Sequence, residues 1–377
     1  MVKRYPVCEP TLVEKEKEYL NLAYDSGFIS GAGEYVEKLE NSFSNFLGSK
    51  YAIAVNNGTS AVHLMVLASG LNAGDEVIVP SFTMAGSIFP LIYAGVVPVF
   101  VDADPQTWCI DVSRIENMIT KDTRAIMAVH IYGYPCDMVV INKIAEKYGL
   151  LVLEDAAESL GSTLFGEKCG VLSECSAFSL FANKVVTSGE GGMVVTNNEK
   201  VYNRARYLRN LAFPLSGPRD YIHDEVGYNY RLSNLLAAIG VAQMENIDKL
   251  VQSRSNNANL YMEILNKDNR IGFQPNSGGI YNSRWMFGIT LNQELSRYAN
   301  SVRKQLAELG IETRPFFKPM HSQKAIRNKP NRVDGEMPVS NTLGETGFYL
   351  PSSSHLKSDE IIEISENLLE IVAKLEC

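Results

Sequence analysis

The chain of 377 residues is long enough for two or three domains and for a large buried core. Hydrophobic residues make up 45% of it and charged residues 21%, which is typical of globular proteins and too apolar for a disordered chain. Its 35 basic and 43 acidic side chains give a net charge of −8, which disfavours binding to nucleic acids or anionic membrane surfaces through charge neutralisation.

Targeting signals and cysteine patterns point to a reduced protein. Pro6, Cys8 and Glu9 interrupt the apolar stretch near the N-terminus, so no signal peptide is expected. No run of about 18 apolar residues occurs, so no spanning helix is expected either. The six cysteines form no CxxC pair, and no nearby His/Cys pair completes a metal site around Cys169 and Cys175. We therefore expect a cytoplasmic protein without a structural metal.

Short apolar runs alternate with segments of helical length between residues 50 and 155. Strands are predicted at Ala52–Val55, Val77–Val79, Val97–Val101, Ala125–Val129 and Leu150–Leu153. Helices are predicted between them at Thr59–Ser69, Asp111–Ile119 and Met138–Tyr148. This alternation predicts a parallel sheet covered by helices on both faces.

The second half of the chain predicts further strands, a loop and a smaller α+β region. Two strands (Ser176–Phe181 and Gly192–Thr196) and a helix (Glu199–Asn210) are followed by Leu211–Val226, which contains two prolines and is expected to be a long functional loop. Helices are also predicted over Ser233–Leu265 and Ser358–Leu375. We expect a large domain over residues 1–245, with an N-terminal arm over 1–25, and a small domain over 246–377.

A glycine-containing turn, NNGTSAVHL (Asn56–Leu64), joins the first predicted strand to a helix. Gly58 permits a tight turn, and the amides of Gly58, Thr59 and Ser60 would lie unpaired at the helix N-terminus. The motif therefore predicts an anion site made from backbone dipoles. A helix cap provided by Thr59 or Ser60 is the alternative interpretation.

The strand at Leu150–Leu153 runs into two carboxylates, Glu154 and Asp155. Open α/β sheets bind ligands at the carboxyl ends of their strands. Burying Asp155 is costly unless a cation or donors meet it, and the protonated ring nitrogen of a cofactor is such a cation. A metal site is the alternative, but no second cluster of Asp, Glu or His at helical spacing supports it.

Lys184 lies between a predicted strand and a glycine-rich turn. In apolar surroundings the pKa of a lysine falls and its amine becomes nucleophilic, although an exposed loop lysine is the alternative. Only one predicted strand separates it from Asp155, so both can face one pocket. An amine, an acid and an anion site are together what pyridoxal phosphate requires of a protein.

Several motifs resemble the sugar aminotransferases of the DegT/DnrJ/EryC1/StrS family. They are, in chain order, NNGTSAVHL, GDEVIVPSFT, PVFVDAD, AVHIYG, EDAAESLGS, FSLFANKVVTSGEGGMVVTN, GYNYRLSN and RPFFKPMH. The resemblance covers nearly the whole chain and looks strongest to the GDP-perosamine synthases, which aminate carbon 4 of GDP-4-keto-6-deoxymannose using glutamate. It implies an α/β protein with the type I fold of PLP-dependent transferases: a large domain with a mostly parallel sheet and a smaller α+β C-terminal domain.

The resemblance also implies roles for single residues. Lys184 would bond the cofactor, pyridoxal 5′-phosphate, and move protons, while Asp155 would pair with the ring nitrogen. Glu158 occupies a position that lies close to the ring in the family. Met84 stands where the family usually has an aromatic residue stacked on the ring, and its polarizable sulfur can pack there.

Four positions match the family's phosphate ligands. Gly58 and Thr59 would bind the phosphate through backbone amides, and Ser179 would add a hydroxyl group. Asn229 matches an asparagine that reaches the phosphate from the partner subunit. The resemblance therefore implies an obligate homodimer with shared active sites.

Substrate recognition is expected to use Arg231, Arg314 and His321. An arginine suits the carboxylate of glutamate or the diphosphate of a nucleotide sugar. Ion pairs at a surface or interface are the alternative for the arginines, as is a structural role for His321. The loop Leu211–Val226 matches a region that approaches the neighbouring active site in the family.

The implied reaction is transfer of an amino group from L-glutamate, which becomes 2-oxoglutarate, to a nucleotide-linked keto-sugar. Family members that dehydrate sugars have histidine in place of the lysine, so Lys184 favours amine transfer. The alternatives are a UDP- or dTDP-linked 4-keto or 3-keto hexose, an 8-oxo octulosonate, or a non-catalytic homologue that keeps the cofactor. A P-loop or GxGxxG motif is absent from the sequence, which disfavours a simple nucleotide-binding protein.

Overall fold

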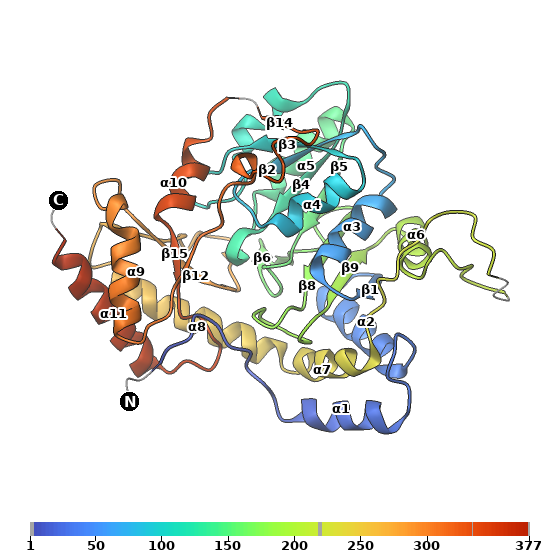
Figure 1. The fold of residues 1–377 in the computed structure, drawn as a ribbon, viewed down its shortest axis with the longest axis horizontal. Helices are drawn as coiled ribbons and strands as arrows, with labels where there is room; N and C mark the ends of the chain where they lie inside the picture. Colours follow the sequence, from blue (N-terminus) through green and yellow to red (C-terminus); the bar gives the residue numbers. More distant parts are fainter. Residues whose placement is uncertain (1–3, 218–220, 334, 376–377) are drawn as a thin grey trace.

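A large central sheet organises the protein (Figure 1), whose computed structural model describes residues 4–217, 221–333 and 335–375. The strand order is β1-β9-β8-β5-β4-β2-β3-β14. These strands are β1 (Tyr51–Val55), β2 (Glu76–Pro80), β3 (Val97–Val101), β4 (Thr123–Val129), β5 (Leu151–Asp155), β8 (Cys175–Ser179), β9 (Gly192–Thr196) and β14 (Arg332–Val333). Only β9 is antiparallel to its neighbours within this sheet, so the mostly parallel sheet expected from the sequence is confirmed.

Helices cover both faces of the sheet, because successive strand residues point to opposite sides. Val77 joins one buried cluster, together with residues of α3 (Gly58–Ala68), α4 (Ala85–Tyr93) and α6 (Glu199–Arg209). Ile78 joins the other, together with residues of α2 (Glu34–Leu47), α5 (Met138–Tyr148) and α7 (Asn234–Met244). The continuous apolar strands are thus buried on both faces.

Two predicted helices differ from the structure. The segment Asp111–Ile119 forms two short 3-10 turns, Val112–Arg114 and Glu116–Met118, and not an α-helix. The Asp111 side chain accepts the Ser113 amide at 3.0 Å, which favours a tight turn over a regular helix. The helix predicted over Ser233–Leu265 is interrupted before α8 (Ile247–Leu265), where Asn246 takes a non-helical conformation.

The C-terminal part of the chain forms its own antiparallel sheet, in the order β10-β12-β15-β13. Its strands are β10 (Ile271–Gly272), β12 (Phe287–Leu291), β13 (Arg314–Pro315) and β15 (Phe348–Leu350). A separate apolar core joins it to α8, α9 (Ala299–Glu308) and α11 (Ser358–Ala373). The helix α10 (Pro338–Thr346) follows β14, which crosses back to pair with β3 of the large sheet. The α+β character of this part is confirmed, while the boundary at residues 245 and 246 stays a prediction.

Smaller elements connect these two layers. A three-stranded sheet consists of β6 (Thr163–Leu164), β7 (Glu167–Lys168) and β11 (Ile280–Tyr281). The expected N-terminal arm contains α1 (Lys15–Asp25), which packs along α7, while Tyr5 bridges to Ile311 in the C-terminal part. The described helices include none that is long and apolar enough to cross a membrane.

The predicted loop Leu211–Val226 contains no helix or strand over its described residues, 211–217 and 221–226. Figure 1 shows it extending outward beyond α6. Residues 218–220 of this loop lie outside the described part of the chain.

Candidate active site

A cavity of about 540 Å³ opens where the aligned strands of the large sheet end. The strand β5 ends at Asp155 and β8 ends at Ser179, while α3 begins just after β1. Seven residues singled out in the sequence line this cavity together: Gly58, Thr59, Met84, Asp155, Glu158, Ser179 and Lys184.

The N-terminus of α3 faces the cavity. Asn57 caps this helix, because its side-chain oxygen accepts the Ser60 amide at 2.8 Å; the cap is therefore neither Thr59 nor Ser60. The amides of Gly58 and Thr59 lie in the first turn, where no intrahelical acceptor exists. A Cβ on Gly58 would lie 2.8 Å from the Cβ of Ser179, so the hydroxyl group of Ser179 stands beside these amides. This arrangement fits a phosphate group.

Asp155 is a buried carboxylate in the cavity wall. The Ala157 amide donates to it at 3.1 Å, and the nearby Ser87 hydroxyl group also acts to lower its pKa. Burial nevertheless raises the pKa of Asp155 above its usual value. A cationic ring nitrogen placed in the cavity would favour the ionised carboxylate, and this chemistry fits a protonated pyridine ring.

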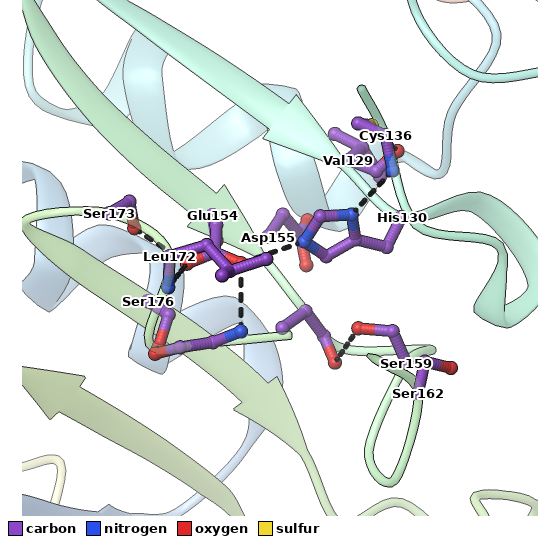
Figure 2. Close-up of polar contacts among 12 residues, drawn as sticks. Val129, His130, Cys136, Glu154, Asp155, Ser159, Ser162, Leu172, Ser173 and Ser176 are labelled. Carbon is purple, nitrogen blue, oxygen red and sulfur yellow. Dashed lines mark hydrogen bonds and ion pairs between the residues drawn. The ribbon is translucent and has the colours of Figure 1, made fainter. Parts of the chain in front are cut away.

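The neighbouring Glu154 points to the other face of β5, because side chains alternate along a strand. Figure 2 shows the polar contacts around its carboxylate. Its carboxylate accepts hydrogen bonds from His130 Nε2 at 2.9 Å, the Gly170 and Leu172 amides at 2.8 and 2.9 Å, and the Ser173 hydroxyl group at 2.8 Å. The adjacent carboxylates therefore have separate tasks: Glu154 anchors the loop before β8, and Asp155 faces the cavity.

Lys184 lies in the turn between β8 and β9, and its side chain is only 12% exposed. Its Nζ atom lies 3.9 Å from Oε1 of Glu158 and 3.5 Å from the centre of the Trp285 ring. Burial lowers the pKa of Lys184 and raises that of Glu158 to about 7. The alternative of an exposed loop lysine is wrong, because this amine is held at the cavity and its environment favours the neutral, nucleophilic form.

Four other residues selected from the sequence do not line the cavity. Asn229 is exposed and accepts a hydrogen bond from Arg231 Nη2 at 3.1 Å. Arg314 is exposed, with Nη2 lying 3.6 Å from Oε1 of Glu312. His321 is half-buried, and its Nδ1 atom lies 2.6 Å from Oγ of Ser81, which agrees with the structural alternative. Substrate and cofactor roles for these four residues stay predictions.

Met84 lines the cavity from the N-terminal end of α4. Its side chain is 49% exposed, and its sulfur accepts the Gly86 amide at 2.8 Å. Stacking of Met84 on a cofactor ring likewise stays a prediction.

Among the cavity residues that sequence reasoning did not single out are Asn57, Ser87 and Trp285. The preference of asparagine for helix N-caps is a signal that identifies Asn57. No local pattern marks Trp285, which reaches Lys184 from the distant C-terminal part of the chain. Among the described residues, no cluster of His, Cys, Asp and Glu side chains is suited to hold a metal ion.

The whole chain is similar to known proteins. The chain is 41% identical to the GDP-perosamine synthase of Escherichia coli O157:H7, covering 98% of this chain and 99% of that protein. It is 39% identical to the GDP-perosamine synthase of Vibrio cholerae, covering 95% and 96% respectively. A crystal structure of a GDP-4-keto-6-deoxymannose-3-dehydratase with bound GDP-perosamine superposes with a TM-score of 0.91 at 26% identity, covering 97% of this chain and all of that one. Residues 10–369 match a family model, and the chain belongs to the DegT/DnrJ/EryC1/StrS aminotransferase family.

Proposed function

We propose that this protein transfers an amino group from L-glutamate to GDP-4-keto-6-deoxymannose, forming GDP-perosamine, with pyridoxal 5′-phosphate as cofactor. The observation that carries the proposal is the convergence of Lys184, Asp155 and the α3 N-terminus on one cavity. The choice of sugar follows the relatives that are 38–41% identical and named GDP-perosamine synthases.

The cavity residues divide the work of binding. The Gly58 and Thr59 amides and the Ser179 hydroxyl group hold the phosphate, and Asp155 keeps the ring nitrogen protonated. When bound, the cofactor supplies an electron sink that stabilises negative charge on the carbon that loses its proton. Met84 borders the space beside the ring.

Lys184 acts as the base and acid of the reaction. Its lowered pKa leaves the amine able to accept a proton from the α-carbon of glutamate and to deliver it, on the same face, to the C4′ carbon of the bound cofactor. Glu158, 3.9 Å away, stabilises the ammonium form between these steps.

A substrate panel tests the choice of sugar. GDP-, UDP- and dTDP-linked keto-hexoses and an 8-oxo octulosonate are each incubated with the protein and glutamate, and amination is measured by mass spectrometry. Amination of the GDP-linked 4-keto sugar supports the proposal. Exclusive amination of another sugar would show that the substrate assignment is wrong, while the assignment as an aminotransferase would stand.

Borohydride reduction tests the cofactor chemistry independently. Treatment of the wild-type protein should attach the cofactor irreversibly to the peptide that contains Lys184. A protein that binds no cofactor and gives no label would contradict both the enzyme proposal and the alternative of a non-catalytic homologue that retains the cofactor.

The proposal includes a homodimer with shared sites. Asn229 and Arg231 are exposed outside the cavity of their own chain, and Tyr221 and Val226 of the adjoining loop are 77% and 81% exposed. Such apolar exposure beside polar residues is typical of an interface. In this arrangement Asn229 of one chain binds the phosphate in the other.

Mixing two inactive variants tests the shared site. Lys184→Ala and Asn229→Ala dimers are inactive or weak alone. After subunit exchange, a mixed dimer has one site with both defects and one with neither. About a quarter of wild-type activity should return if the sites are shared, and none if each chain works alone.

A reduced, cytoplasmic setting is also part of the proposal. Cys8, Cys109, Cys136, Cys169 and Cys175 are all free thiols. Cys377 lies outside the described residues.

A further inference from the structure

The backbone at Asn183 and Lys184 is held by side chains from distant parts of the chain. Trp285 Nε1 donates to the Asn183 carbonyl at 2.8 Å. Arg254 Nη2 donates to the Asn183 carbonyl at 3.4 Å and to the Lys184 carbonyl at 3.3 Å. Arg254 Nη1 also donates to the Trp285 carbonyl, so the two side chains form one connected unit around the lysine turn.

Arg254 is an unusual cation for a buried position. It comes from α8, is only 2% exposed, and bonds only to neutral groups: three carbonyls, the Ser354 hydroxyl group at 3.0 Å and the Cys8 thiol at 3.6 Å. Within the described chain, no carboxylate forms an ion pair with it. Burying an unpaired guanidinium opposes folding, so a well-packed apolar side chain would serve a purely structural purpose better.

We propose that Arg254 and Trp285 are positioning residues for Lys184. Arg254 fixes the peptide that carries the lysine, and the face of the Trp285 ring packs against its ammonium group. This inference rests on the proposed function only in taking Lys184 as the reacting amine. The fixed turn and the Trp285 ring restrict the rotamers of the flexible Lys184 side chain. The amine is therefore already oriented toward the cavity when a substrate binds.

The two positioning residues act on the lysine with opposite electrostatic signs. The charged and titratable groups that face Lys184 are Glu158, Asp155, Cys8 and Arg254. The guanidinium of Arg254 opposes protonation of the amine, whereas the negative face of the Trp285 ring favours it. Loss of Arg254 should therefore raise the pKa of Lys184, and loss of the ring should lower it.

Chemical modification measures these opposite shifts. The rate of Lys184 acetylation by acetic anhydride is followed against pH by mass spectrometry of the full-length protein. The protein is first treated with glutamate and then freed of it by gel filtration, so that Lys184 is released from the cofactor and no free amino acid consumes the anhydride. Arg254→Met should raise the midpoint and Trp285→Leu should lower it, each by roughly tenfold in proton affinity. Arg254→Lys, which keeps the charge, should stay close to wild type.

Arg284→Met is the matched control. Arg284 is 4% exposed and also bonds to neutral groups, the Gln274 and Pro275 carbonyls and the Asn276 side chain. Its loss should leave the Lys184 midpoint unchanged. Shifts of the same sign in Arg254→Met and Trp285→Leu, no shift in either, or an equal shift in Arg284→Met would overturn the inference. Borohydride labelling of the wild-type protein without glutamate reports separately on the proposed function.

Discussion

Gly58 and Ser179 approach each other so closely that a Cβ on the glycine would lie 2.8 Å from the Cβ of the serine. This contact brings the end of β8 against the first turn of α3, and it places a hydroxyl group beside two free amides. Ser179 ends β8 and Gly58 begins α3 shortly after β1, so the proposed phosphate site depends on how tightly two separate elements pack.

Replacement of Gly58 by alanine should therefore weaken cofactor binding. The added methyl group forces α3 and Ser179 apart, and we expect at least about a tenfold loss of affinity for pyridoxal phosphate. Equilibrium dialysis of the purified variant measures this loss. The double variant Gly58→Ala/Ser179→Gly relieves the clash, so it should bind the cofactor more tightly than Gly58→Ala alone. An unchanged affinity in Gly58→Ala would contradict the assignment.

Lys184→Ala should abolish turnover, because the reacting amine is gone. The variant should still bind pyridoxamine phosphate, since the α3 N-terminus and Asp155 remain in place. Activity assays and absorbance spectroscopy of the bound cofactor measure the two effects. Full activity in this variant would rule out the proposed mechanism.

The neighbours Glu154 and Asp155 should respond differently to amide substitution. Asp155→Asn should lower kcat at least about a hundredfold with little change in melting temperature, because a neutral amide no longer keeps the ring nitrogen protonated. Glu154→Gln should instead destabilise the fold by about 1–3 kcal/mol, since the amide NH2 group cannot accept the hydrogen bonds that meet this carboxylate. Thermal unfolding and steady-state kinetics on both variants separate these outcomes, and equal effects on both would contradict the division of tasks.

Glu158→Gln should change how stability depends on pH. The pKa of Glu158 is raised from 4.5 to about 7 by burial, so the ionised carboxylate is disfavoured in the folded protein. Its contribution to stability is complete below pH 4.5 and is lost as the pH rises through about 7, with an upper limit of about 3 kcal/mol. The melting temperature of the variant relative to wild type should therefore be higher at pH 8 than at pH 5. The reverse order would mean that the ion pair with Lys184 outweighs the burial of the carboxylate.

The strands and many helices were predictable because burial imposes clear periodicities. The helix α5 was predicted with its observed bounds, Met138–Tyr148, since its apolar residues repeat at helical spacing. Two-residue alternation along β5 also implies that Glu154 and Asp155 face opposite sides, an inference available from sequence. In contrast, the 3-10 turns after Asp111 depend on a side-chain hydrogen bond that competes with the helix.

The candidate site was predictable only where its residues follow strand ends. Asp155, Ser179 and Gly58 lie at such positions, and the cavity brings them together. Trp285 and Arg254 contact the lysine turn through long-range packing, which leaves no mark in the neighbouring sequence. The resemblance suggested Asn229, Arg231, Arg314 and His321, and none of these four residues lines the cavity.

The turn that carries Lys184 is held by residues that come before and after it in the sequence. Cys8 precedes it, and Arg254 and Trp285 follow it. During synthesis the ribosome releases Lys184 long before Trp285, so the nascent chain contains the amine before it contains the groups that hold it. The contacts that hold the lysine turn are therefore complete only when the C-terminal part has docked. Chains that terminate early would carry this lysine without its supports, and their large sheet alone would not make an aminotransferase.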